Sequence, residues 1–375
     1  MNKPFVQSVI GLNFGDEGKG FVVDKLSARK PNSLVVRFSG GPNAGHRVIR
    51  GGQDHIFSTF GSGTFNGCHT ALTEDTLFCP ISFQIERDVL KGKVEKLGLN
   101  LDEIKFYLHP KCPMISPYDI AWNVAENEFK EQGKTCGKGI GATMDRHFHS
   151  EYKLYAIDLM DESLLDVKLD SIRGYYREKL SKESSHFFNK FYDTFDKNID
   201  YFTKVIKYVR GTIVFYLNKT SIFLKEFGAD NIIFEGSQGL LLDMNYGVHP
   251  PYTTYSNLSI ENIVKHIDVD EAIYVTRSYL TRHGFGDIFS DNKIETTFKD
   301  EQNVTNEFQG EFRIAELNFE LIKRSLILEA LNFGNNTELC IALNHSKFVD
   351  ADYLKRVEKE LKDITENILI LDEWS

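Results

Sequence analysis

Short apolar runs that end at glycine-rich or polar turns recur along this chain. The first run covers residues 5–12, and a second, SLVVRF, covers 33–38. Each is followed by a glycine loop and is typical of a buried strand. Residues 20–29 lie between them and have the pattern of a helix. Strand, loop, helix and strand within ~35 residues make a βαβ unit, which predicts a parallel sheet.

The same pattern returns in the second half of the chain. Short apolar runs cover 231–234, 272–276 and 339–343, an amphipathic helix is expected over 350–363, and a last strand over 367–371. We therefore predict an α/β fold with a mostly parallel central sheet and helices on both faces. Ligands of such sheets bind outside the carboxyl ends of the strands, so the glycine loops should converge on one cleft.

The stretch from about residue 158 to 224 differs in composition, being rich in Lys, Asp, Glu, Phe and Tyr. Aromatic residues recur in it at helical spacing: Phe187, Phe188, Phe191, Tyr192 and Phe195. An aromatic binding surface would account for this spacing, but the core face of helices packed on the sheet is the favoured interpretation. We predict one large α/β domain over residues 1–375 with a helical insertion around 158–224.

Composition narrows the class of function. The net charge is −10 and the pI about 5.6, so the chain lacks the basic footprint of a nucleic-acid-binding protein, and any phosphate site must be local. No apolar run approaches the roughly 20 residues of a membrane helix. The first residues carry no long apolar segment, and the five cysteines are scattered without a CxxC pair. These features predict a cytoplasmic protein with free thiols and no structural zinc.

The most informative segment is GLNFGDEGKG at residues 11–20. Gly15, Gly18 and Gly20 allow a tight turn that aims backbone N–H groups at phosphate oxygens. The helix that follows adds its N-terminal partial positive charge, and Lys19 adds a full one. The GxxxxGK[ST] spacing of a Walker A loop is absent. The segment therefore predicts a phosphate loop of another kind.

Two titratable residues on these loops indicate chemistry beyond phosphate binding. Asp16 lies inside the phosphate loop, where its negative charge repels the ligand, so we expect it to hold Mg²⁺, to abstract a proton, or both. The next strand ends in GGPNAGH at 40–46, which places His46 on a second glycine loop at the same sheet edge. An imidazole there suits acid catalysis or stabilisation of a transferring phosphoryl group.

Together, GDEGKG and GGPNAGH resemble the adenylosuccinate synthetase family. Further segments resemble motifs of that family in the same order: SG at 62–63, CPMI at 112–115, GKGIG at 137–141, FEGSQGLLLD at 234–243, PYTTYSN at 251–257 and YLTRHGFG at 279–286. The resemblance covers about residues 5–290. It implies the P-loop-like fold of adenylosuccinate synthetases and a homodimer.

The resemblance also implies a ligase with a two-step reaction. A nucleoside triphosphate donates its γ-phosphoryl group to the 6-oxygen of a purine monophosphate, and the amine of L-aspartate then displaces phosphate. IMP would give adenylosuccinate, with GTP or ATP as the donor and Mg²⁺ as the cofactor. Removing the N1 proton turns the purine lactam into an oxyanion that can attack phosphorus, and phosphorylation then makes the 6-oxygen a good leaving group.

Matching positions carry roles over from the family. The implied catalytic residues are Asp16, Lys19 and His46. Asp16 would take the N1 proton and, with the backbone carbonyl of Gly45, ligate Mg²⁺, while His46 would donate hydrogen bonds to the phosphoryl group in flight. Lys19 and the backbone of 15–20, Glu17 included, would cradle phosphate. The other implied contacts are Asn43 and Gln238 for the purine nucleotide, Thr135 and Thr254 for its 5′-phosphate, and Arg282 for ribose or phosphates.

Two departures from the family pattern concern the aspartate loop and the nucleotide-binding region. The aspartate loop of the family, ATTGRRRR, is nearest to residues 306–313, where Arg313 alone remains to clamp the α-carboxylate of aspartate. Cys136 and Lys138 replace a threonine and an arginine beside the nucleotide, and Arg47 follows the catalytic histidine. The identity of the amino acid is therefore less firmly indicated than the ligase chemistry.

A third departure concerns the donor base. The guanine-recognition motif of the family, TKLD, should follow the strand at 339–343, but the sequence there is NHSKFVD. Lys347 occupies the place of the carboxylate that accepts the guanine N1 and N2 hydrogens. A lysine has no acceptor atom, so specificity for GTP should be weakened and ATP becomes a candidate donor.

Several alternatives stay open. Short, divergent members of this kind resemble bacteriophage aminoadenylosuccinate synthetases, which use dGMP with an ATP or dATP donor, and the intact Asp16 does not settle IMP against dGMP. A catalytically dead nucleotide-binding homologue is disfavoured by the intact Asp16, Lys19, His46 and Gln238. A P-loop GTPase switch is disfavoured because the Walker A and NKxD-type motifs are missing. In a homodimer, Arg146 is the candidate for an arginine contributed across the interface.

Overall fold

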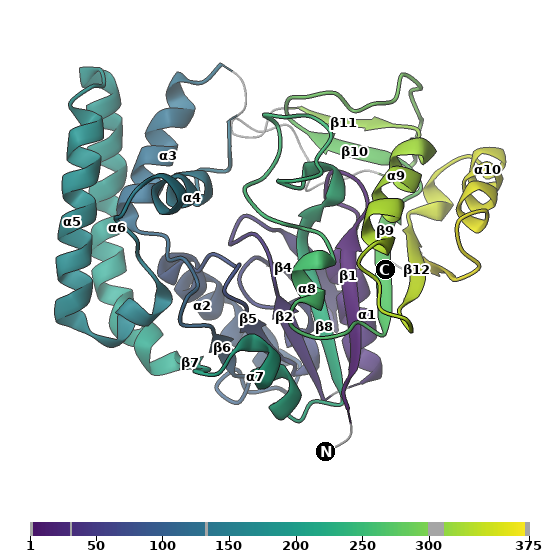
Figure 1. The fold of residues 1–375 in the computed structure, drawn as a ribbon, viewed down its shortest axis with the longest axis horizontal. Coiled ribbons are helices and arrows are strands. Elements are labelled where there is room, and N and C mark those ends of the chain that lie inside the picture. Colours follow the sequence, from purple (N-terminus) through teal and green to yellow (C-terminus); the bar gives the residue numbers. More distant parts are fainter. Residues whose placement is uncertain (1–2, 31, 132–133, 299–310, 372–375) are drawn as a thin grey trace.

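The computed structural model describes residues 3–30, 32–131, 134–298 and 311–371. Its centre is a nine-stranded sheet in which every neighbouring pair of strands is parallel (Figure 1). The strands are, in spatial order, β13 (Ile368–Leu371), β12 (Glu338–Asn344), β9 (Glu271–Arg277), β1 (Phe5–Gly11), β8 (Asn231–Gly239), β2 (Ser33–Arg37), β5 (His69–Leu72), β6 (Phe106–Leu108) and β7 (Ile213–Phe215).

Helices cover both faces of this sheet, which confirms the expected α/β class. The helices are α1 (Lys19–Arg29), α2 (Pro80–Lys96), α3 (Pro117–Phe129), α4 (Ile140–His149), α5 (Glu162–Leu180), α6 (Ser185–Thr212), α7 (Thr220–Glu226), α8 (Glu261–Val264), α9 (Phe319–Ala330) and α10 (Ala351–Lys362). Successive side chains of β1 point to opposite faces of the sheet, as in any pleated strand. Val6 and Ile10 share a core with α8, α9 and α10, whereas Val9 packs with α1 on the opposite face.

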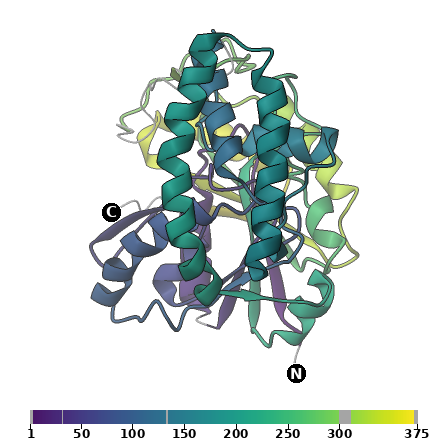
Figure 2. The same cartoon turned by 90° about the vertical axis from the view of Figure 1, so that its left-hand side faces the viewer.

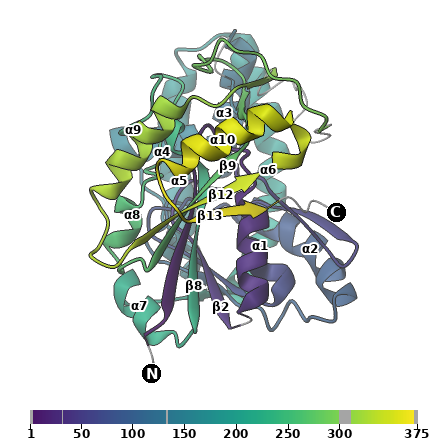
Figure 3. The ribbon, with the colours of Figure 1, turned by 90° about the vertical axis from the view of Figure 1, so that its right-hand side faces the viewer.

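The C-terminal end of the chain builds one edge of the sheet. Figure 3 shows α10 lying over β12 and β13. Val357 and Leu361 of α10 share the core with Ile341 and Leu343 of β12. The amphipathic helix and the last strand expected from the sequence are therefore both present, within a few residues of the expected bounds.

Residues 158–224 are mostly helical, as expected, and α5 and α6 stand side by side in front of the sheet (Figure 2). Phe187 and Phe191 of α6 are buried, and Phe187 packs against Trp122 of α3 with ring centroids 5.0 Å apart. Phe188 on the same helix is 46% exposed. The core interpretation of the aromatic spacing thus holds for Phe187 and Phe191, although α6 packs mainly on α2 and α3 and not on the sheet as expected. The same stretch also holds the short edge strand β7, which the pattern did not predict.

Two small antiparallel hairpins lie outside the main sheet. One pairs β3 (His46–Arg50) with β4 (Gln53–Phe57), and the other pairs β10 (Leu280–His283) with β11 (Phe312–Ala315). Neither was expected from the apolar pattern, and both carry candidate site residues. Within the described ranges, no helix has the length and apolar character needed to cross a membrane.

Candidate active site

Three glycine-containing segments meet at the carboxyl ends of adjacent strands. β1 runs into the phosphate loop, β2 leads to the loop at 40–46, and β8 lies between β1 and β2 and contains FEGSQG. Gly239 of β8 lies so close to the phosphate loop that a Cβ there would be 2.2 Å from the carbonyl oxygen of Asn13. The convergence of the glycine loops that the sequence predicts is therefore confirmed.

The phosphate loop is held together from inside by Glu17. Its Oε1 atom accepts hydrogen bonds from the backbone N–H groups of Asn13 (3.0 Å) and Gly15 (2.8 Å), and its Oε2 atom pairs with Nζ of Lys19 at 2.9 Å. Both members of this ion pair are almost completely buried. The Glu17 side chain thus shapes the loop, while phosphate contacts from the backbone at 15–20 and from Lys19 stay predictions.

Gly20, the second residue of α1, allows the helix to approach His46 closely. A Cβ at Gly20 would lie 2.7 Å from Cβ of His46 and 3.0 Å from Oγ of Ser62. Both distances are too short for ordinary packing, so a serine or threonine at this position, as in a Walker A loop, does not fit. The contact brings the phosphate loop and the second glycine loop together.

Asp16 occupies a left-handed backbone conformation with φ 60°. This conformation is unusual for a residue with a side chain and is typical of functional loops. Nε of Arg277, at the end of β9, donates to the backbone oxygen of Asp16 at 2.6 Å, and Nε2 of His283 lies 3.7 Å from its Oδ2 atom. Burial raises the pKa of the Asp16 carboxyl, and the positive charges of His283 and Arg277 oppose that rise.

His46 opens β3 with its ring buried against Glu235 of β8. Nδ1 of His46 lies 2.7 Å from Oε1 of Glu235, and Oε2 of Glu235 accepts a hydrogen bond from the backbone N–H of Ser62 at 3.1 Å. The Ser62 hydroxyl also donates to Oε1 of Glu235. Burial alone would raise the pKa of Glu235, but His46, Arg37 and Ser62 together lower it to about 2. Glu235 is therefore ionised and fixes the orientation of the imidazole.

Burial lowers the pKa of His46 itself, and Glu235 offsets this only in part. The neutral ring then carries its proton on Nδ1, facing Glu235, and Nε2 has a lone pair. Nε2 is buried and has no hydrogen-bond partner among the described residues. A buried polar atom without a partner indicates a place for a ligand group or a proton. Sequence reasoning assigned Glu235 no role, although an acidic residue inside a buried strand is itself an unusual signal.

Two candidates for the 5′-phosphate lie on segments that approach each other. Thr135 is anchored to α3. Its backbone N–H donates to the side chain of Asn127 at 3.0 Å, and its hydroxyl lies 2.9 and 3.1 Å from the amide nitrogen and oxygen of Asn123. Thr254 donates its backbone N–H to Leu242 at 2.8 Å. At the start of α4, a Cβ on Gly141 would be 3.4 Å from the ring of Tyr255, the neighbour of Thr254. The N-terminus of α4 thus lies beside the loop that carries Thr254.

Arg282 and Arg313 lie directly opposite each other across β10 and β11. Arg282 donates to the carbonyls of Phe285 (3.1 Å) and Asp287 (2.5 Å), and Arg313 donates to those of Gly284 (2.5 Å) and Gly286 (2.7 Å). In the part of the chain that is described, the hydrogen bonds of both guanidinium groups run to backbone carbonyls rather than to carboxylates. Burial, followed by the charge of Arg313, lowers the pKa of Arg282 to about 10. Such a pair favours an anion nearby.

The remaining nucleotide candidates sit at the same sheet edge. Asn43 is half-buried on the second glycine loop, its Oδ1 atom is buried without a hydrogen-bond partner among the described residues, and Gly45 beside it is exposed. Gln238 is half-buried near the end of β8. Arg282 stacks over the ring of Phe14 in the phosphate loop at 4.3 Å. The structure thus brings most of the proposed site residues onto neighbouring loops.

Comparison with known proteins decides the family. The model of the adenylosuccinate synthetase family matches residues 8–313 of this chain. This chain belongs to the adenylosuccinate synthetase family. Curated synthetases from Oleidesulfovibrio alaskensis and from Neisseria meningitidis serogroup C are 30% and 32% identical to it over 289 and 292 residues. Each match covers 74% of this chain, but this chain spans only 64% and 63% of those relatives' own lengths.

Two solved structures share the fold of this synthetase family member. The fully ligated adenylosuccinate synthetase of Plasmodium falciparum has a TM-score of 0.67 and 18% identity, covering 91% of this chain and 77% of that one. The succinoaminodeoxyadenylate synthetase of cyanophage S-2L, solved with dGMP and with dATP as an energy donor, has a TM-score of 0.66 and 12% identity. That match covers 100% of this chain and 93% of the phage chain.

The end of β12, where synthetases of this family carry their guanine motif, is aromatic in this chain. His345 has φ 62°, and its ring lies 4.4 Å from Phe298 and 5.4 Å from Phe348 between ring centroids. Asn344 donates its side-chain amide to the backbone oxygen of Glu17 at 2.7 Å, and Lys347 is exposed. No carboxylate occurs in the segment 344–348, so the departure inferred from the sequence is retained in the fold.

One expectation from the family resemblance is wrong. Arg146 was the candidate for an arginine that reaches a partner subunit, but its side chain is completely buried in its own chain. It donates to Asp119 through Nε (2.9 Å) and Nη2 (2.8 Å) and to the carbonyl of Tyr152 through Nη1 (2.5 Å). Tyr176 also donates to Asp119, at 2.7 Å. A guanidinium held in this way is part of the core between α3, α4 and α5. Of the expected aspartate loop at 306–313, residues 306–310 lie outside the described residues.

Proposed function

We propose that this chain is a purine-nucleotide ligase that joins L-aspartate to the 6-position of a purine monophosphate, with IMP as acceptor and adenylosuccinate as product. A nucleoside triphosphate would drive the reaction through a 6-phosphoryl intermediate. Asp16 lies on the phosphate loop, and His46 lies on the second glycine loop with its ring bonded to the ionised Glu235. These two segments come into close contact at Gly20. A base and a buried imidazole beside a phosphate loop suit proton removal followed by phosphoryl transfer.

The first step uses Asp16. Its carboxylate takes the N1 proton of the purine, and the 6-oxygen gains the charge needed to attack the γ-phosphorus. Burial raises the pKa of this carboxyl, which makes the carboxylate a better proton acceptor than an exposed aspartate. His283 and Arg277 keep the ionised form accessible because their charges oppose that rise.

The phosphoryl group in flight is stabilised by His46 and Lys19. As negative charge approaches the buried Nε2 atom, the ring takes up a proton from water there and becomes a hydrogen-bond donor, because Glu235 balances the imidazolium charge from the Nδ1 side. Lys19, now paired with Glu17 at 2.9 Å, supplies positive charge at the start of α1.

The family resemblance implies Mg²⁺ at this site, and the residues present fit it. The half-buried Asp16 carboxylate and the exposed backbone carbonyl of Gly45 are hard oxygen donors of the kind that Mg²⁺ prefers. When bound, the ion would neutralise charge on the phosphates during transfer.

Aspartate enters in the second step. Arg313 would hold its α-carboxylate, with Arg282 directly across the hairpin adding positive charge. The amine then attacks C6, and the phosphorylated oxygen leaves as inorganic phosphate. We propose that Asn43 and Gln238 position the purine, and that Thr135 and Thr254 receive its 5′-phosphate near the N-terminus of α4.

A second candidate is a dGMP-dependent synthetase with an ATP or dATP donor. It is supported by the carboxylate-free aromatic end of β12 and by the phage synthetase bound to dGMP and dATP, whose fold extends over this entire chain. A homodimer is also proposed from the family.

Phosphate release with aspartate and Mg²⁺ separates these functions, with IMP, dIMP, GMP and dGMP each tested against GTP, ATP and dATP. The proposal expects turnover with IMP. Turnover with dGMP alone would establish the second candidate. Absence of aspartate-dependent turnover with every pair would point to a nucleotide-binding protein without ligase activity.

A further inference from the structure

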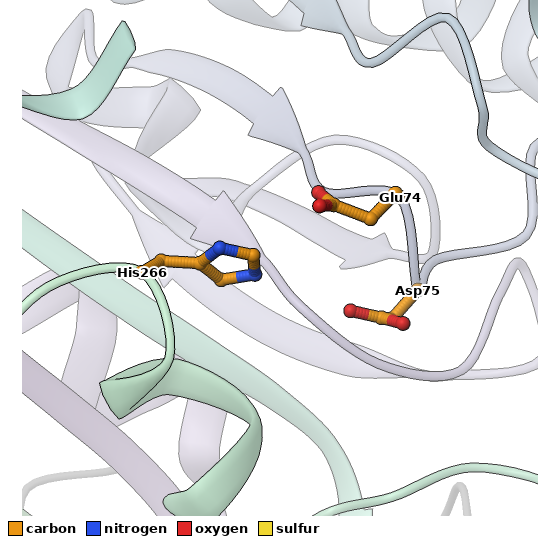
Figure 4. Close-up of side chains that lie close together, drawn as sticks. All are labelled: Glu74, Asp75 and His266. Atoms are coloured by element: carbon orange, nitrogen blue, oxygen red, sulfur yellow. The ribbon is translucent and has the colours of Figure 1, made fainter. Parts of the chain in front are cut away.

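Three side chains of types that can ligate a metal ion lie close together outside the proposed active site. Glu74 and Asp75 lie on the loop after β5, and His266 follows α8, so the cluster joins two segments far apart in the sequence (Figure 4). One ligand atom from each of the three residues lies within 4.8 Å of the others. Figure 4 shows the imidazole of His266 directed toward the two carboxylates.

The His266 ring presents an unsatisfied atom to this cluster. Its Nε2 atom is buried and has no hydrogen-bond partner among the described residues. A buried imidazole nitrogen normally has a donor, an acceptor or a metal within reach, because leaving it unpaired costs free energy.

Among the described residues, the charge of Asp75 is paired with a lysine, whereas Glu74 forms no ion pair. Glu74 and Asp75 supply two negative charges, and Lys265 pairs with Asp75 at 2.5 Å from the exposed side. His109, on the loop after β6, lies near Glu74. The Thr220 hydroxyl donates to Glu74 at 2.5 Å and orients that carboxylate. A metal cation bound here would give the Glu74 carboxylate a partner of opposite charge.

We propose that Glu74, Asp75 and His266 bind a divalent transition-metal ion of the Zn²⁺ or Co²⁺ class. Two carboxylates and one imidazole are a common donor set for such ions, whereas Mg²⁺ takes all-oxygen sites. Ligand bonds of about 2.0–2.2 Å require the three side chains to close in from their present spacing. The exposed Lys265 pair is weak and can be displaced. Thr220 then acts as the outer partner that orients a ligating carboxylate.

An ion here would connect the loop after β5 to the loop after α8, in two segments that contact residues 38–40 at the start of the second glycine loop. Leu77, shortly after Asp75, donates its backbone N–H to the carbonyl of Gly40 at 2.8 Å. Asn262 of α8 donates to the carbonyl of Phe38 at 2.9 Å. The metal would therefore tie the β5 loop to the α8 loop behind residues 38–40. Its role is structural, and the inference does not depend on the proposed ligase activity.

Metal titration of the full-length protein tests the site. After removal of metal with a chelator, Zn²⁺ and Co²⁺ are added under calorimetry, and the Co²⁺ form is examined by visible spectroscopy. We expect one ion per chain, a Co²⁺ spectrum without a thiolate charge-transfer band, and a rise in melting temperature with Zn²⁺. His266→Gln and Glu74→Gln should each weaken binding at least about 10-fold. His186→Gln is the matched control, because His186 pairs with Glu128 at 3.2 Å on the surface, away from the cluster.

Three results would overturn the proposal: no stoichiometric binding, equal affinity in wild type and His266→Gln, or a thiolate band that assigns the ion to cysteine. If either variant fails to fold, two measurements on the wild-type chain still test the proposal. A Co²⁺ spectrum of oxygen and nitrogen ligands with a thermal shift would support the site, and the absence of both would contradict it.

Discussion

Nδ1 of His46 lies 2.7 Å from Oε1 of Glu235, and both side chains are buried at the carboxyl edge of the sheet. The pair joins the second glycine loop to β8, the strand between the two loops. Glu235 keeps its negative charge in this position, with a pKa of about 2, and can therefore balance a proton on His46 whenever a phosphoryl group faces Nε2. This relationship leads to the first prediction.

Glu235→Gln should lower kcat about 100-fold while leaving the KM for the purine nearly unchanged, because the amide oxygen can accept a hydrogen bond from Nδ1–H but cannot balance the charge of an imidazolium. Initial rates at saturating triphosphate measure the effect. Ser62→Ala is the companion variant: it removes one hydrogen bond to Glu235 but keeps the charge, so its loss should be much smaller. Equal losses in the two variants would show that only the packing of this network matters.

The contact between α1 and His46 gives a second prediction. Gly20→Ala should reduce turnover about 100-fold, because the new Cβ must displace His46 or shift the phosphate loop. Gly92→Ala is the control, since a Cβ on that helical glycine meets no atom within 4 Å. The control should retain full activity and gain up to about 1 kcal/mol in free energy of unfolding. Normal activity in Gly20→Ala would mean that the close approach has no functional importance.

The buried Arg146–Asp119 pair predicts a stability effect rather than a subunit effect. Arg146→Met leaves Asp119 charged and unpaired in the core, which should cost roughly 3–5 kcal/mol in free energy of unfolding. Urea denaturation and sedimentation would measure stability and oligomeric state together. Arg173→Ala, which breaks an exposed pair with Asp170, should change stability little. If Arg146→Met altered the oligomeric state with stability unchanged, the interface role would be restored.

His147 makes stability depend on pH. Burial, reinforced by Arg146, lowers its pKa to about 4. The unfolded chain, with an ordinary histidine pKa of about 6.5, therefore binds more protons than the folded one between these values. The stability contributed by neutral His147 is complete above pH 6.5 and is lost as pH falls toward 4. At pH 5 the loss should be about 2 kcal/mol relative to pH 7. His147→Gln should show a smaller difference between the two pH values, and an unchanged difference would contradict this assignment.

The sequence predicted the parts of the site that follow from strand order. Parallel strands end at one sheet edge, so Asp16 and His46 could be placed together from two apolar runs and the glycine loops after them. The sequence did not predict the role of Glu235. The side chain of β8 that points toward His46 is determined by the pairing of β8 with β1 and β2. Arg282 and Arg313 were assigned separately because their pairing arises from an unpredicted hairpin.

The error at Arg146 has a similar origin. A family motif indicates that an arginine is present near a position, but it does not show whether that side chain faces solvent or a buried carboxylate. Asp119 lies on the preceding helix α3, and Tyr176 reaches it from α5. Only the packing of three helices determines that Arg146 is enclosed within its own chain.

The transfer of the purine 6-oxygen to phosphate tests the central claim most directly. IMP labelled with ¹⁸O at the 6-position would be incubated with the protein, aspartate, Mg²⁺ and the preferred triphosphate, and the released phosphate examined by mass spectrometry. The 6-phosphoryl mechanism predicts one ¹⁸O atom in each phosphate, full dependence on aspartate for product formation, and loss of label transfer in Asp16→Asn. Aspartate-dependent phosphate without the label would contradict phosphorylation of the 6-oxygen and with it the proposed role of Asp16.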